Sequence, residues 1–113
     1  MAKQYTWHKI TDEELIREHE INVLEVSNKK ICFTRYQGQV YAFAHKCPHA
    51  GGMMADGVID ASGNVVCPLH RYKFSVKNGY NCSGEGYYLK TYPTEQREDG
   101  MYIGLEKTGI FGW

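Results

Sequence analysis

Residues 44–70 read AHKCPHAGGMMADGVIDASGNVVCPLH, and this stretch contains the most informative motifs of the sequence. It contains two short boxes, Cys47-Pro48-His49 and Cys67-Pro68-Leu69-His70, with residues 50–66 between them. A proline follows each cysteine, which stiffens the backbone and removes an amide donor, as a tight loop requires. We therefore expect two loops that direct two thiolates and two imidazoles toward one metal centre.

Two thiolates and two neutral imidazoles suit either one tetrahedral zinc ion or a two-iron cluster. Zinc sites of this composition commonly take a Cys-Cys pair from one segment and a His-His pair from another. Here each box supplies one cysteine and one histidine. The mixed order favours the cluster, because each of two adjacent loops can send its cysteine to one iron and its histidine to the other. A zinc-binding interaction module remains the alternative.

The other two cysteines are interpreted as non-ligands. Cys32 lies between Ile31 and Phe33 in an expected strand, where a buried thiol behaves as a small apolar residue. Cys82 lies in a third loop, but the four-ligand set is complete without it. Neither a signal-peptide run at the N-terminus nor an apolar stretch of roughly 20 residues is visible, so we expect a cytoplasmic protein without a membrane span. Thiols stay reduced in that compartment, which argues against a disulfide framework.

Length and charge narrow the class of protein further. A chain of 113 residues is expected to form a single domain, residues 1–113. Thirteen basic and thirteen acidic residues give a formal net charge of zero, which removes the general attraction on which nucleic-acid binding depends. Nucleic acid is therefore an unexpected partner.

Short β-rich segments separated by turn residues predict an all-β sandwich or barrel. A capping threonine, Thr11, before an acidic turn also predicts a short N-terminal helix over residues 12–18. The expected metal-binding loops lie at about 44–57, 67–71 and 81–86, which are too polar or too rich in glycine for core strands. The expected strands cover residues 21–26, 31–36, 40–44, 58–59, 65–66, 72–74, 89–92 and 101–105.

The two boxes resemble those of the Rieske ferredoxins, whose pattern is Cys-Pro-His followed by Cys-Pro-x-His. The resemblance covers most of residues 40–105 and includes further positions: Ala50-Gly51-Gly52, Asp56-Gly57-Val58, Phe74, Asn78-Gly79, Leu89 and Tyr92-Pro93. It implies a Rieske-like β-sandwich or partly open barrel with a small cluster-binding subdomain. It also implies a 2Fe-2S cluster with Cys47 and Cys67 on the buried iron and His49 and His70 on the iron nearer the surface.

The flanking residues depart from the high-potential Rieske proteins of respiratory complexes. Those proteins add a cysteine to each box and form a disulfide, but Gly52 and Leu69 occupy these positions here. They also carry a serine and a tyrosine whose hydroxyls donate to sulfur, where this chain has Tyr72 and Phe74. Fewer donors stabilise the reduced cluster less, so we expect a midpoint near the low end of the Rieske range, roughly −150 mV.

The resemblance implies a one-electron carrier between a flavin-containing reductase and a terminal Rieske oxygenase. Such a protein performs no bond chemistry itself. A catalytic oxygenase subunit would need a second, mononuclear iron site and hundreds more residues. A second interpretation within the family is the small subunit of an NAD(P)H nitrite reductase. Many such subunits lack some ligands, whereas all four are present here, which favours the ferredoxin.

Overall fold

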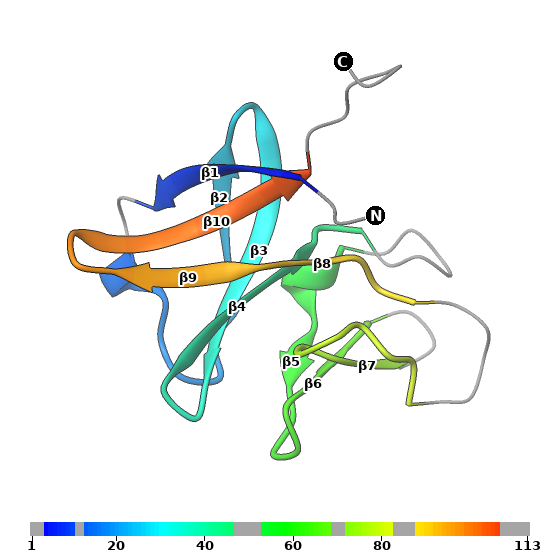
Figure 1. The fold of residues 1–113 in the computed structure, drawn as a ribbon. Helices are drawn as coiled ribbons and strands as arrows, with labels where there is room; N and C mark the ends of the chain where they lie inside the picture. Colours follow the sequence, from blue (N-terminus) through cyan, green and yellow to red (C-terminus); the bar gives the residue numbers. More distant parts are fainter. Residues whose placement is uncertain (1–3, 11–12, 47–52, 69–71, 83–87, 107–113) are drawn as a thin grey trace, which may run out of the picture.

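The computed structural model describes residues 4–10, 13–46, 53–68, 72–82 and 88–106. Within these ranges the chain is almost entirely β-structure, arranged as three open antiparallel sheets (Figure 1). This confirms the all-β prediction and its open form, because none of the described sheets closes into a barrel.

The sheets differ in how their strands follow the sequence. One has the order β1-β10-β9 and brings together both ends of the described chain: β1 (Tyr5–Ile10), β10 (Gly100–Glu106) and β9 (Thr94–Arg97). A second has the order β2-β3-β4-β8: β2 (Asn22–Val26), β3 (Lys29–Tyr36), β4 (Gln39–Ala44) and β8 (Thr91–Tyr92). The third, called the small sheet below, has the order β5-β6-β7: β5 (Val58–Ile59), β6 (Asn64–Val66) and β7 (Lys73–Ser75).

Two-residue turns join β2, β3 and β4 into a meander, in which each strand pairs with the next. Val26 pairs with Lys29 across the first turn, and Tyr36 pairs with Gln39 across the second. Both residues of each turn have positive φ, at 51° and 66° in Ser27-Asn28 and at 52° and 81° in Gln37-Gly38. Positive φ at both central positions is the turn geometry that matches the twist of a hairpin.

The β2-β3-β4-β8 sheet, called the central sheet below, is buried on both faces. Successive side chains of β3 and β4 point alternately into two apolar clusters, one on each face. On one face Ile31, Phe33, Val40 and Ala42 pack with Ile10, Ile16, Met101 and Ile103, against the β1-β10-β9 sheet. On the other face Cys32, Tyr36 and Phe43 pack with the small sheet and its connections: Met54, Ile59, Val65, Cys67, Phe74, Val76 and Leu89. The second cluster thus fixes the small sheet to the rest of the molecule.

The expected N-terminal helix is only a single 3-10 turn, η1 (Glu13–Leu15). Its surroundings explain why it is so short. Leu15 is exposed and Ile16 is the buried anchor of this segment, while Glu18 already forms a parallel bridge with Arg35. His19 then has a φ of 62°, which is incompatible with a continuing helix.

Two strands were absent from the sequence prediction. In β1 the β-favouring residues Tyr5, Thr6 and Trp7 carry a signal that could have identified it. By contrast, β9 is the polar segment Thr94–Arg97, whose strand form depends on pairing with β10. None of the helices in the described ranges has the length and apolar character needed to cross a bilayer.

Candidate metal centre

The first expected loop begins at the end of β4, and the chain after it pairs again with the residues that precede it. Lys46 and Met53 form an antiparallel bridge, and the Met54 N–H donates to the His45 carbonyl at 2.8 Å. The chain on the two sides of residues 47–52 is therefore held together at Lys46 and Met53. Cys47 and His49 lie in this interval, outside the described residues.

The chain that follows this loop packs tightly against β6. η2 (Met54–Asp56) ends at Gly57, whose N–H donates to the Met54 carbonyl at 3.0 Å. A Cβ atom at Gly57 would lie 2.0 Å from the Val66 carbonyl oxygen. Only glycine permits this approach, which holds the return of the first loop against the strand that leads to Cys67.

Cys67 is the one predicted ligand within the described ranges. It directly follows β6 and is completely buried, at 0% exposure. Its N–H donates to the Tyr72 carbonyl at 2.8 Å, which continues the β6–β7 ladder by one pair. A four-residue connection, residues 68–71, therefore separates Cys67 from Tyr72. His70 belongs to this connection and lies outside the described residues.

The third loop begins beside β7, where it forms an isolated bridge. Phe74 forms an antiparallel bridge with Asn81, and the Cys82 N–H donates to the Lys73 carbonyl at 2.8 Å. The described part of this loop ends at Cys82. Its first residues thus extend the small sheet on the side of β7 opposite β6.

Cys82 points away from Cys67. Alternation along paired strands places Cys67 on the buried face with Val65, whereas Cys82 shares the outer face with Asn64. The Cys82 thiol is exposed and donates to the Asn64 side-chain oxygen, with Sγ and Oδ1 3.4 Å apart. This orientation supports its interpretation as a non-ligand.

Cys32 is a core thiol of the central sheet, at 0% exposure. Burial raises its pKa from 9.0 to about 12. A metal ligand must be a thiolate, and a site that disfavours the thiolate this strongly is unsuited to ligation. Cys32 therefore belongs to the apolar packing, as the sequence predicts.

The raised Cys32 pKa predicts a loss of stability in alkaline solution. Above about pH 9 the unfolded chain loses this proton while the folded protein keeps it, so unfolding becomes easier until the folded pKa of about 12 is reached. We expect this residue to lower the free energy of unfolding by about 1.4 kcal/mol per pH unit. The measurement is urea unfolding from pH 8 to 10.5, comparing wild type with Cys32→Ala. The variant should be less stable at pH 8 but show a shallower alkaline decline, whereas Cys82→Ala should keep the wild-type slope.

Phe74 and Tyr72, at the positions of the two hydroxyl donors, differ in their burial. Phe74 is completely buried in the apolar cluster that contains Cys67, and Tyr72 packs partly buried against the same cluster. The Phe74 position therefore offers no hydroxyl to a sulfur atom. Among the described residues no group of three or more potential metal ligands gathers, and three of the four predicted ligands lie outside those ranges.

Comparison with protein families gives a match to the Rieske [2Fe-2S] domain over residues 6–93. The ferredoxin component of the alkene monooxygenase system of Xanthobacter autotrophicus is 24% identical over 87 residues, covering 77% of this chain and 71% of the relative. The 3-phenylpropionate/cinnamic acid dioxygenase ferredoxin subunit of Photorhabdus laumondii is 30% identical over 78 residues, covering 68% of this chain and 74% of the relative.

Solved structures share the fold. The ferredoxin of carbazole 1,9a-dioxygenase from Nocardioides aromaticivorans has a TM-score of 0.76 at 20% identity, over 90% of this chain and 99% of that one. A Mycobacterium tuberculosis structure, described as that of an NADH-dependent nitrite reductase small subunit, has a TM-score of 0.77 at 16% identity. It covers 95% of this chain and 99% of that one. The two scores are nearly equal, so the fold does not separate these two classes of protein.

Proposed function

Because the chain belongs to the Rieske [2Fe-2S] domain family, we propose that it is a ferredoxin that carries one electron at a time to a terminal oxidoreductase. The observation that carries this proposal is the buried Cys67 at the end of β6, within a complete Cys-His and Cys-His donor set. The sequence relatives described above are ferredoxin components of oxygenase systems.

The donor set fits a Rieske-type 2Fe-2S cluster. Cys47 and Cys67 would bind one iron as thiolates, and His49 and His70 would bind the other as neutral imidazoles. The complete burial of Cys67 suits the iron that is shielded from solvent. When bound, the cluster supplies reversible one-electron transfer at a potential above that of an all-cysteine cluster.

The protein contributes rigidity and exclusion of water. The bridge between Lys46 and Met53 holds together the two ends of the first loop. The hydrogen bond from the Cys67 N–H to the Tyr72 carbonyl does the same for the second loop. Met54, Phe74 and Leu89, each at most 2% exposed, pack in the cluster that contains Cys67 and keep solvent from its side. A thiolate held this firmly at Cys67 would need little rearrangement between oxidation states, as an electron carrier requires.

The partners that fit this role are a flavin-containing reductase as donor and a Rieske oxygenase as acceptor. Two structures of ferredoxin–oxygenase complexes of carbazole 1,9a-dioxygenase contain this fold. In one it matches 28% of a longer chain, with a TM-score of 0.77, and in the other it matches 94% of a chain, with a TM-score of 0.75. Cys32 and Cys82 form no disulfide with another described cysteine, and a reducing, cytoplasmic location would suit such thiols.

The nitrite reductase small subunit is the second candidate, favoured by the fold similarity to the mycobacterial structure. Its partner would be a nitrite reductase large subunit. The two candidates differ in the protein that oxidises the reduced chain. The test is stopped-flow mixing of the reduced protein with the oxygenase or nitrite reductase large subunit encoded beside its gene. Rapid reoxidation by an oxygenase supports the ferredoxin proposal, and reoxidation only by a nitrite reductase subunit contradicts it.

Adding a hydroxyl at position 74, where the high-potential Rieske proteins carry a tyrosine, should raise the reduction potential of the cluster. In Phe74→Tyr the added hydroxyl enters the buried cluster that contains Cys67, where it can donate to sulfur and stabilise the more negative reduced state. A net gain of about 1 kcal/mol corresponds to a rise of roughly 40 mV for a one-electron couple. The measurement is the midpoint by protein-film voltammetry.

The matched control is Phe33→Tyr, which buries the same hydroxyl in the other apolar cluster. Both variants should lose stability, but only Phe74→Tyr should change the midpoint. An unchanged or lower midpoint in Phe74→Tyr, with full cluster content, would contradict the prediction.

A further inference from the structure

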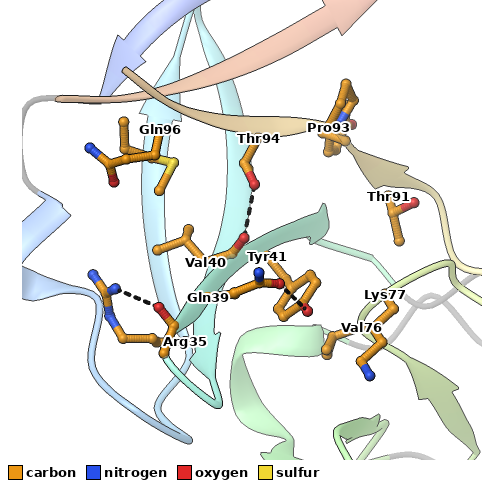
Figure 2. Close-up of a pocket in the computed structure, with 13 residues that line it drawn as sticks. Arg35, Gln39, Val40, Tyr41, Val76, Lys77, Thr91, Pro93, Thr94 and Gln96 are labelled. Carbon is orange, nitrogen blue, oxygen red and sulfur yellow. Dashed lines mark hydrogen bonds between the residues drawn. The ribbon is translucent and has the colours of Figure 1, made fainter. Parts of the chain in front are cut away.

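A pocket of about 450 Å³ opens where the small sheet meets the two larger sheets (Figure 2). Residues of β3, β4, β8, β9 and β10 line it, together with Val76 and Lys77 from the segment after β7. Its volume lies within the roughly 300–1,000 Å³ of small-molecule sites, and a junction between packed units is a common place for them. Cys67, the proposed cluster ligand that the structure describes, is not among the residues that line it.

The charged residues that line the pocket are all basic. Within the part of the chain that the structure describes, its lining includes two basic residues, Arg35 and Lys77, and no acidic residue. Figure 2 shows these two residues on opposite sides of Gln39 and Tyr41. A pocket with cationic ends and no carboxylate attracts anions.

Arg35 is positioned to recognise a carboxylate. Its Nε donates to the Ile16 carbonyl at 3.0 Å and its Nη1 donates to the Gly38 carbonyl at 3.3 Å. These two bonds hold the guanidinium but leave three of its five N–H donors for a ligand. Among the described residues no carboxylate forms an ion pair with Arg35, in contrast to Lys9 and Lys90, which pair with Asp99 and Glu106. The nearby Glu18 carboxylate accepts from the backbone N–H groups of Gln37 and Gly38 instead.

The remaining walls combine apolar residues with the polar side chains of Gln39, Thr91, Thr94 and Gln96. Val40, Val76, Pro93 and Met101 give an apolar lining. The Thr94 hydroxyl donates to the Val40 carbonyl at 2.8 Å, which ties β9 to β4 across the pocket (Figure 2). The cavity is thus formed before any ligand enters, which lowers the entropic cost of binding.

We propose that this pocket binds a small organic monoanion, a carboxylate attached to a compact apolar or aromatic body. The carboxylate is held by Arg35, and the body lies against the apolar walls. Because Arg35 belongs to the central sheet and Val76 to the segment after β7, the ligand bridges the two units that the second apolar cluster joins. This binding function is separate from electron transfer.

The test compares two probes of similar shape, benzoate and uncharged benzyl alcohol, on the ¹⁵N-labelled holoprotein. We expect benzoate to shift the backbone amide signals of Gly38, Gln39 and Thr94 saturably, as one site. Benzyl alcohol should bind at least tenfold more weakly, a difference of about 1.4 kcal/mol. Equal affinity for the two probes, or shifts that do not saturate, would overturn the proposal.

Variants locate the site. Arg35→Gln should weaken benzoate binding at least tenfold, whereas Arg17→Gln, an exposed arginine outside the pocket, should leave it unchanged. Because Arg35 also holds two carbonyls, Gln39→Trp provides an independent variant at an exposed lining residue, where the indole should fill the pocket and abolish binding. Retained binding in Gln39→Trp, or equal losses in the two arginine variants, would contradict the assignment.

Discussion

Replacing Cys67 with alanine is expected to abolish the cluster. Cys67 is proposed to supply one of two thiolates to the buried iron, and its complete burial at the end of β6 leaves no room for water to substitute. Without that thiolate the iron is incompletely ligated. Cys32 packs in the same apolar cluster, but burial raises its pKa to about 12 and keeps it a thiol, so it is a poor replacement. Iron content should fall from two atoms per chain to near zero, and the visible absorption should disappear.

The matched control is Cys82→Ala, which removes the exposed thiol on the opposite face of the same sheet. It should retain full iron content and the wild-type spectrum. Loss of the cluster in both variants would indicate that Cys82 is also required. Retention of the cluster in Cys67→Ala would contradict the proposed ligand set.

Replacing Gly79 with alanine is expected to cause the largest loss of stability of any small substitution. Gly79 has a φ of 78°, and a Cβ atom there would lie 1.9 Å from the Leu89 carbonyl oxygen. The backbone is fixed in this place, since the Gly79 N–H donates to Ser75 at 2.8 Å and the Gly79 carbonyl accepts from Leu89 at 3.0 Å. The clash therefore cannot be relieved by a side-chain movement.

Gly38→Ala separates the backbone strain from the clash. Gly38 has a φ of 81°, but a Cβ atom there would have no neighbour within 4 Å. We expect a cost of about 1–2 kcal/mol for Gly38→Ala, from the left-handed conformation alone. Gly79→Ala should lower the free energy of unfolding by about 4 kcal/mol or more, because the turn that follows β7 and the backbone of Leu89 must also move apart. Urea unfolding measures both, and equal costs would contradict the close approach.

Much of the fold was predictable because most strands are short apolar runs between recognisable turn residues. The turn residues 27–30 and Gln37-Gly38 separate the expected strands, and the structure has turns at both places, although β3 begins earlier than expected, at Lys29. The strand Thr94–Arg97 was not predictable, because its polar residues are ordered by pairing with β10 rather than by burial of their own. The helix prediction was too long because the capping signal at Thr11 is local, whereas the pairing of Glu18 with Arg35 is a long-range contact.

The candidate site likewise combines features that are local in sequence with features that depend on long-range strand pairing. The ligand types and their spacing are local in sequence, so Cys47, His49, Cys67 and His70 could be proposed from the sequence, and they stay a prediction. The buried position of Cys67 and the outward direction of Cys82 depend on the register of β6 and β7, which sequence patterns do not fix. The pocket beside Arg35 joins five strands and a turn and had no sequence signal.

The central claim is that the chain holds a Rieske-type 2Fe-2S cluster. Iron and acid-labile sulfide analysis, with an electron paramagnetic resonance spectrum of the reduced protein, tests it most directly. We expect two irons and two sulfides per chain and an axial spectrum with a low average g value. Stoichiometric zinc without sulfide, in a colourless protein, would contradict it.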